Sequence, residues 1–154
     1  MISFLKFFRF LGPTLLFFGT FVVLPPVVLS YFNNVLDNEM LNIYLVCMAY
    51  SVIIFFTLRQ RKFTYSPKDG FVITFLTWVI ISLLASMPFL NANLVFFDAL
   101  FEAVSGLTTT GSTVIKDLSQ LPDHILLYRQ LLQWAGGVGL VIVVLAIIPQ
   151  FPVA

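Results

Sequence analysis

A short polar segment, "GLTTTGSTVI", lies between two long apolar stretches and spans Gly106 to Ile115. It contains three consecutive threonines and a second glycine, and no acidic residue occurs between Ser105 and Lys116. Threonine disfavours a helix because its β-branch restricts the side-chain torsion, whereas glycine adopts a positive φ that other residues resist. We therefore expect an extended chain whose main-chain oxygens replace the water shell of a small cation.

Four residues of this segment are the candidate ion ligands, and they lie where an extended chain would carry a turn: Thr109, Thr110, Gly111 and Ser112. Without a carboxylate in the segment, selectivity by a ring of acidic side chains is excluded. A simpler alternative remains open, in which Gly106 is an ordinary helix C-cap and the threonines only bridge two helices. The surrounding elements bear on this choice.

The composition is that of a membrane protein. Of 154 residues, 60% are hydrophobic and 10% are charged, and the mean hydropathy is +1.02, whereas soluble domains have about 25% charged residues. The net charge is +1 and the basic residues lie mainly at segment ends, which excludes a nucleic-acid surface. With one cysteine, Cys47, one histidine and no phosphate-binding glycine loop, the chain is not expected to be an enzyme or to hold a cofactor.

Apolar segments long enough to cross a bilayer occur four times, because about 20 helical residues span its core of about 30 Å. They are expected at residues 7–29, 41–58, 71–90 and 125–148. We interpret the first as a retained membrane helix, since its apolar run exceeds the roughly 7 to 15 residues of a signal-peptide core. Pro13, Pro25 and Pro26 are expected to kink or end it, because proline removes a helical donor.

The segment Asn93 to Ser105 is apolar, but its roughly 13 residues would span only about 20 Å as a helix. It also contains Asp98 and Glu102, and a charge at the centre of a membrane helix costs about 2.5 to 3.5 kcal/mol. We expect a re-entrant half-helix with both carboxylates shallow or facing protein. The negative end of its dipole would favour a cation.

The predicted fold is an all-α membrane protein in two parts. Residues 1–66 form a pair of N-terminal transmembrane helices, and residues 67–154 form one helix, re-entrant pore loop, helix repeat. Most basic residues fall on one side of the membrane if the segments alternate, and basic residues mark the cytoplasmic side. They are Lys6, Arg9, Arg59, Arg61, Lys62 and Lys68. The protein is therefore expected to cross the membrane several times with a cytoplasmic N-terminus.

Three charged residues are expected to support the pore loop: Asp98, Glu102 and Arg129. The two acids either attract cations at the outer mouth or lie near the start of the half-helix, where its dipole favours a carboxylate. The side chain of Arg129 either extends to the membrane–water interface or pairs with a loop carboxylate such as that of Glu102. His124 is expected to be solvated in an outer loop, and the "GGVG" motif at 136–139 is expected to serve close helix packing.

Two segments carry a family resemblance: "FFDALFEAVSGLTTTGSTV", residues 96–114, and "LLYRQLLQWAGGVGLVIVVLAIIP", residues 126–149. Both closely resemble the Trk-type potassium uptake proteins, the superfamily of TrkH, KtrB and plant HKT transporters. The similarity is strongest to the N-terminal part of bacterial TrkH, which carries an extra pair of N-terminal helices. In that family, four helix, pore-loop, helix repeats surround a single pore. The resemblance implies that the four candidate ligands form one quarter of the filter, with potassium at Thr109, Thr110 and Gly111.

The function implied by this resemblance is potassium uptake across the bacterial inner membrane. Gly111 matches the filter glycine that accompanies potassium preference, whereas serine in the first repeat of some plant relatives accompanies sodium. Because the sequence contains one repeat, conduction is expected to need the missing repeats or other copies of the chain. The other implied partners are membrane lipid and a cytosolic nucleotide-binding Trk regulatory subunit. The alternative is a non-conducting membrane scaffold or a truncated remnant of such a transporter.

Overall fold

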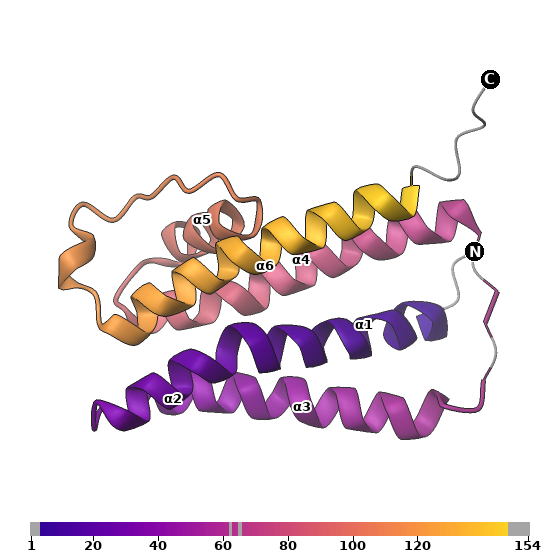
Figure 1. Cartoon of the computed structure of the whole chain (residues 1–154), viewed down its shortest axis with the longest axis horizontal. Helices are drawn as coiled ribbons and strands as arrows, with labels where there is room; N and C mark the ends of the chain where they lie inside the picture. The colour runs from indigo at the N-terminus through magenta and orange to yellow at the C-terminus, as the bar shows by residue number, and fades with distance from the viewer. Residues whose placement is uncertain (1–3, 62, 65, 148–154) are drawn as a thin grey trace.

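The computed structural model describes residues 4–61, 63–64 and 66–147, which form helices joined by short links, with no strand among them. In chain order the elements are α1 (Phe4–Phe18), the π-helical turn η1 (Gly19–Val23), α2 (Leu24–Phe32), α3 (Asn38–Leu58), α4 (Pro67–Asn91), α5 (Phe96–Leu107), the 3-10 turn η2 (Leu118–Gln120) and α6 (Asp123–Ile147). The long helices run side by side, and the short α5 lies beside α4 and α6 toward one end (Figure 1). The predicted all-α fold is confirmed.

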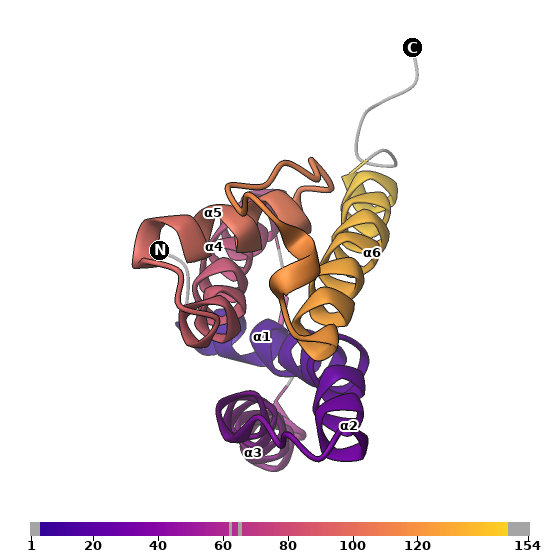
Figure 2. The same cartoon turned by 90° about the vertical axis from the view of Figure 1, so that its left-hand side faces the viewer.

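The first membrane helix changes its geometry in the middle. α1 continues through Pro13 without ending, whereas Pro25 and Pro26 stand at the start of α2, directly after η1. The ring of a proline clashes with the carbonyl four residues earlier, which for Pro25 is that of Phe21, and a π turn makes room for it. The kink expected at Pro25 takes this form, and α2 departs from the direction of α1 (Figure 2).

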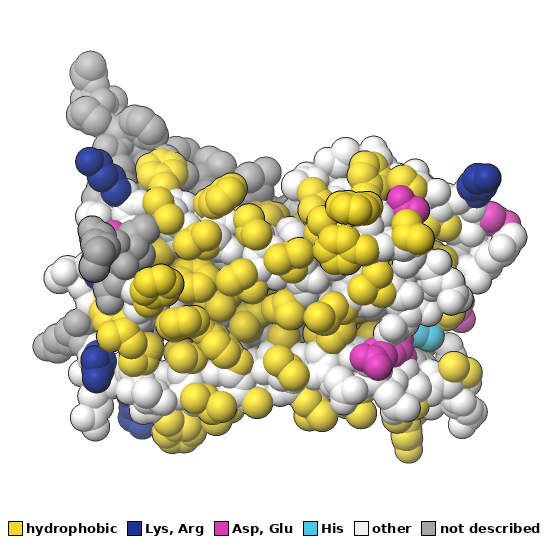
Figure 3. Space-filling model, turned by 180° about the vertical axis from the view of Figure 1, so that it is seen from behind, with side chains coloured by type: hydrophobic (Ala, Val, Ile, Leu, Met, Phe, Trp, Pro, Cys, Tyr) yellow, Lys and Arg dark blue, Asp and Glu magenta, His cyan; other side chains and the backbone are white. Residues whose placement is uncertain are grey.

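Three helices among the described residues are long and apolar enough to cross a membrane: Phe4–Phe32, Asn38–Leu58 and Lys68–Asn91. They coincide with the first three expected spans. The fourth expected span falls on α6. This helix has 25 residues, the same length as α4. Several side chains near the end of α6, and residues 148–154, lie outside the described part, so this span stays a prediction. Figure 3 shows apolar side chains over the middle of one face and charged ones toward its two ends.

Ion pairs join helices at both ends of the bundle. At one end, Lys6 Nζ donates to Asp69 Oδ2 at 2.8 Å and ties the start of α1 to the start of α4. At the other end, Asp37 caps α3, and its Oδ2 lies 3.4 Å from His124 Nε2 in the first turn of α6. His124 is only 6% exposed, so the expectation of a solvated histidine is wrong. Burial is possible because Asp37 gives the imidazole a polar partner.

The N-terminal helices pack closely on each other and on the loop-bearing helices. α1 contacts α3, α2 contacts α6, and η1 contacts both α3 and α6. Small residues allow this approach: a Cβ on Gly12 would lie 3.1 Å from Ile54 Cγ2, and one on Gly19 would lie 3.1 Å from Cys47 Cβ. The described residues of the two predicted parts, 1–66 and 67–154, therefore form one packed body, and the division into two parts stays a prediction from the sequence.

Candidate functional site: the re-entrant loop

α5 is a half-helix of 12 residues, about 18 Å long, that starts three residues and ends two residues later than the expected segment. Asp98 lies in its first turn, where the helix dipole favours a carboxylate, and no group in the described part of the chain bonds to it. Glu102, one turn later, is 0% exposed. Of the two placements expected for this carboxylate, shallow or facing protein, the structure has Glu102 facing protein, and a buried carboxylate cannot attract cations at an outer mouth.

The chain leaves α5 through a tight turn over Thr108 and Thr109. The amide of Thr110 donates to the carbonyl of Ser105 at 3.0 Å, and the amide of Thr109 donates to that of Gly106 at 2.9 Å. This is the bonding of a Schellman motif, whose left-handed position is usually glycine. Here Thr109 occupies it, with φ 58°. The expectation that all three threonines are extended is therefore wrong, because the first two close the helix.

Gly111 is a second left-handed residue, with φ 75°, as the sequence predicts for this glycine. A Cβ at Gly111 would meet only Gln133 Nε2, at 3.9 Å, so the backbone conformation and not the available space favours glycine here. A β-branched residue held in the left-handed region, such as Thr109, stores about 1 to 3 kcal/mol of strain. Such strain persists only where the surroundings fix the backbone, and the loop has such surroundings.

The carbonyl oxygens of the predicted ligands differ in what they accept. No group in the described part of the chain donates to the carbonyl of Thr109 or Thr110. The carbonyl of Gly111, in contrast, accepts from Arg129 Nη2 at 3.1 Å. The threonine hydroxyls are satisfied locally: Thr109 Oγ1 donates to the carbonyl of Thr108, and the hydroxyls of Thr108 and Thr110 lie 2.9 Å apart. The two unoccupied carbonyl oxygens therefore lie directly after α5.

Ser112 is anchored from both flanking helices. Its carbonyl accepts from Ser105 Oγ of α5 at 2.6 Å and, over a longer 3.4 Å, from Arg129 Nη2 of α6. Ser105 belongs to the site although nothing in its spacing indicates this role, because its partner lies seven residues away across a turn. The far half of the predicted filter is thus attached to the protein, and the near half is free.

A buried cluster around Glu102 fixes the rest of the loop. Arg129 Nε donates to Glu102 Oε2 at 3.0 Å, while Oε1 accepts from the hydroxyl of Thr113 and, at 2.8 Å, from the amide of Val114. Arg129 is 6% exposed, so of the two alternatives for this residue the structure has the ion pair and not the extension to the interface. Thr113 is an addition to the predicted site. Every oxygen of the buried carboxylate has a partner, as burial requires.

α6 approaches the end of α5 closely, and glycine makes this approach possible. A Cβ on Gly136 would lie 2.0 Å from the carbonyl oxygen of Leu107. One on Gly106 would lie 3.1 Å from Leu132 Cβ. Helices of membrane proteins pack closely where small residues face each other. The expected packing role of the glycine motif is confirmed at Gly136.

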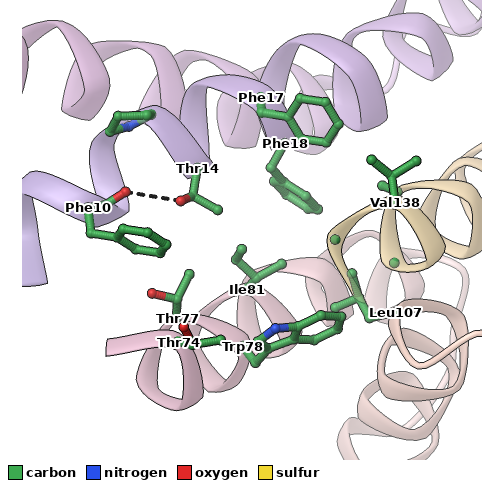
Figure 4. A pocket seen from close by; sticks show the side chains of 14 residues that line it. Phe10, Thr14, Phe17, Phe18, Thr74, Thr77, Trp78, Ile81, Leu107 and Val138 are labelled. Carbon is green, nitrogen blue, oxygen red and sulfur yellow. Dashed lines mark hydrogen bonds between the residues drawn. The ribbon is translucent and has the colours of Figure 1, made fainter. Parts of the chain in front are cut away.

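An apolar cavity of about 300 Å³ lies between α1, α4 and α6 beside Leu107 and Gly136 (Figure 4). Aromatic side chains such as Trp78 form much of its wall. The hydroxyls of Thr14 and Thr77 donate to carbonyls of their own helices, at 3.0 and 2.8 Å. Since the rest of the wall is apolar apart from Thr74, the cavity offers a cation little to replace its hydration. The oxygens of the loop, and not this cavity, are the candidate ion ligands.

These features define an α-helical membrane protein in which a half-helix and a re-entrant loop lie between two long helices. The chain belongs to the TrkH family of cation transport proteins, whose family model matches residues 36–152. That family consists of transporters and not of enzymes.

Similar proteins include several called Trk system potassium uptake protein TrkH. The one from Salmonella typhimurium is 34% identical over 144 residues, which are 92% of this chain and 30% of the relative. The one from Halomonas elongata is 37% identical over 152 residues, 94% of this chain and 31% of the relative. The crystal structure of the potassium transporter TrkH from Vibrio parahaemolyticus matches with a TM-score of 0.81 and 35% identity, over 96% of this chain and 32% of that one. This chain thus spans somewhat less than a third of the length of these relatives.

Proposed function

We propose that this chain forms one quarter of the potassium filter of a Trk-type uptake protein. The observation that carries the proposal is the pair of main-chain oxygens of Thr109 and Thr110, which accept no hydrogen bond from any described residue. Carbonyl oxygens held in this way replace the hydration shell of a passing potassium ion. A carbonyl has two lone pairs, so Gly111, with one donor, keeps one for the ion. Ser112 accepts from two donors and acts as an anchor, which differs from the role expected from the sequence.

The charges around the loop suit a cation. The C-terminal end of α5 carries a partial negative charge of about half an elementary charge, and the two unoccupied oxygens follow it directly. Arg129 alone would repel a cation, but Glu102 lies against its guanidinium and balances the charge. The loop is thereby anchored by an arginine without a net positive charge beside the proposed ion position.

By family resemblance, four such units enclose one pore, and the other three come from further repeats or further chains. The same resemblance makes the bacterial inner membrane the proposed location and a cytosolic nucleotide-binding Trk regulatory subunit the proposed partner. The gathering of basic residues at one end of the bundle supports a cytoplasmic N-terminus. Potassium is then the cargo, and the chain needs no cofactor.

The test is a chimera in which this chain replaces the corresponding part of TrkH from Vibrio parahaemolyticus. We expect the chimera to restore growth at low potassium to a bacterium that lacks other potassium uptake. Gly111→Asp should abolish this growth, because a side chain strains the left-handed position and a carboxylate disturbs the filter. Gly70→Asp is the matched control, since a Cβ on Gly70 has no neighbour within 4 Å.

Equal rescue by the Gly111→Asp chimera would refute the filter assignment. A parent chimera that inserts and folds but never restores growth would favour the alternative of a non-conducting scaffold.

A further inference from the structure

An apolar groove lies on the surface between α1 and α3, with an arginine among its lining residues. Its volume is about 410 Å³, within the roughly 300 to 1,000 Å³ of ligand pockets. The hydroxyl of Ser51, at its base, is already bonded to the carbonyls of Gly12 and Cys47, at 2.9 and 2.7 Å. The remaining wall is apolar apart from Arg9 and is formed by Gly12, Pro13, Leu16, Val52, Ile54, Phe55 and Phe56.

A second arginine stands at the same end of this groove. Arg59 follows Val52 by seven residues, so the two share one stripe of α3, and its guanidinium carbon lies 5.6 Å from the ring centre of Phe55. α1 and α3 run in opposite directions, which brings the early part of α1 to the end of α3 (Figure 1). Arg9 therefore lies in the wall at one end of the groove and Arg59 lies beyond that same end, next to Phe55 of the wall, and the apolar trough runs from them toward the middle of the helices.

Neither arginine has an acidic partner in the described part of the chain. Asp69, the acid at this end, accepts from Lys6 and from the amide of Ser66. The other described acids lie in the links and helix starts of the opposite end and in α5: Asp37, Glu39, Asp98, Glu102, Asp117 and Asp123. An uncompensated positive rim on an apolar trough is complementary to a molecule with an anionic head and an apolar tail.

We infer that this groove binds an anionic membrane phospholipid, with its phosphate between Arg9 and Arg59 and one acyl chain along Leu16 and Val52. Basic pockets between membrane helices on the cytoplasmic side recognise anionic lipid head groups. A zwitterionic lipid carries an ammonium group beside its phosphate and binds less well for that reason. This site is separate from the loop and does not depend on whether the chain conducts potassium.

The test is native mass spectrometry of the full chain in detergent, titrated with phosphatidylglycerol or with phosphatidylcholine of the same acyl chains. We expect one phosphatidylglycerol to be retained more tightly than phosphatidylcholine. Arg9→Gln and Arg59→Gln should each weaken the binding of phosphatidylglycerol about fivefold. This is the factor that corresponds to about 1 kcal/mol for each basic residue near an anionic lipid. Arg61→Gln is the matched control, because it removes a positive charge from the same end at a residue that neither lines the groove nor shares the α3 stripe of Val52 and Arg59.

A second variant tests the trough without touching the arginines. Val52→Trp places a large side chain in the groove at an exposed position, so the fold should survive while phosphatidylglycerol is lost. Equal retention of both lipids, an equal effect of Arg61→Gln and Arg9→Gln, or unchanged lipid binding by Val52→Trp would each overturn the inference. Complete competition by inorganic phosphate would also overturn it, since the groove would then be a site for the free anion.

Discussion

Arg129 and Glu102 form a buried ion pair across 27 residues of sequence, with Arg129 Nε 3.0 Å from Glu102 Oε2 and side chains 7% and 0% exposed. The same arginine reaches the carbonyl of Gly111, and the same carboxylate receives the amide of Val114. The pair therefore joins α5 to α6 and holds the loop at two places, Gly111 and Val114. Of the four predicted ligands, Thr109 and Thr110 are the two whose carbonyls accept from no group in the described part of the chain.

Breaking this ion pair from one side should be costly. Glu102→Gln leaves the guanidinium buried without a counter-charge, and Arg129→Gln does the same to the carboxylate, so each should lower the free energy of unfolding by about 3 to 5 kcal/mol. The double variant should lose clearly less than the sum, because it leaves no isolated charge. Denaturant unfolding in detergent measures this, with the exposed Lys116→Gln as control. Additive single losses would show that the two charges are not coupled.

Gly136 should tolerate no side chain. A Cβ there would meet the main-chain oxygen of Leu107 at 2.0 Å, and neither backbone can yield without separating α6 from α5. Overpacking of this kind costs about 1 to 3 kcal/mol, and contact with backbone places Gly136→Ala at the upper end. Gly70→Ala, whose Cβ meets nothing, is the control in thermal unfolding. A melting temperature of Gly136→Ala equal to that of Gly70→Ala would contradict the close approach.

Position 109 should favour glycine over alanine, the reverse of the order inside a helix, because the residue that closes a Schellman turn is left-handed. Both substitutions remove the hydroxyl bond to Thr108, so their difference isolates the left-handed backbone. That conformation costs a residue with a Cβ about 1 to 2 kcal/mol, and the greater freedom of unfolded glycine offsets part of this. Thr109→Gly should therefore be more stable than Thr109→Ala by roughly 0.5 to 1 kcal/mol. Equal or reversed stabilities would exclude the Schellman turn at this residue.

The loop after the filter segment should loosen in acid. Hydrogen bonds from the side chain and amide of Ser119, and from Gln120, lower the pKa of Asp117. A lowered pKa in the folded state means that this stabilisation is present above the ordinary pKa, about 4, and is lost as the pH falls through the lower value. Hydrogen exchange of the Ser119 amide should thus be slower in the wild type than in Asp117→Asn at neutral pH. The two rates should converge in acid, and a difference that persists there would contradict this origin.

The membrane class and the half-helix could be predicted because composition and segment length determine them. The segment from Asn93 to Ser105 was too short and too charged to span, and α5 follows from that. The left-handed Thr109 could not be predicted, since intrinsic preference argues against it and only the surrounding bonds hold it there. The sequence indicated Arg129 as one possible partner of Glu102. Choosing between this ion pair and an arginine that extends to the membrane interface required the packing of α6 on α5. His124 contacts Asp37, which lies 87 residues earlier in the chain, and no local sequence pattern indicates this contact.

The most direct test of the central claim is the position of a heavy potassium substitute in a complete transporter that contains this chain. Crystals of the chimera grown in rubidium should show anomalous density in contact with the carbonyl oxygens of Thr109 and Thr110, on the side away from Arg129. Density that is bounded by other residues and leaves these two oxygens without an ion, in a chimera that transports potassium, would contradict the account.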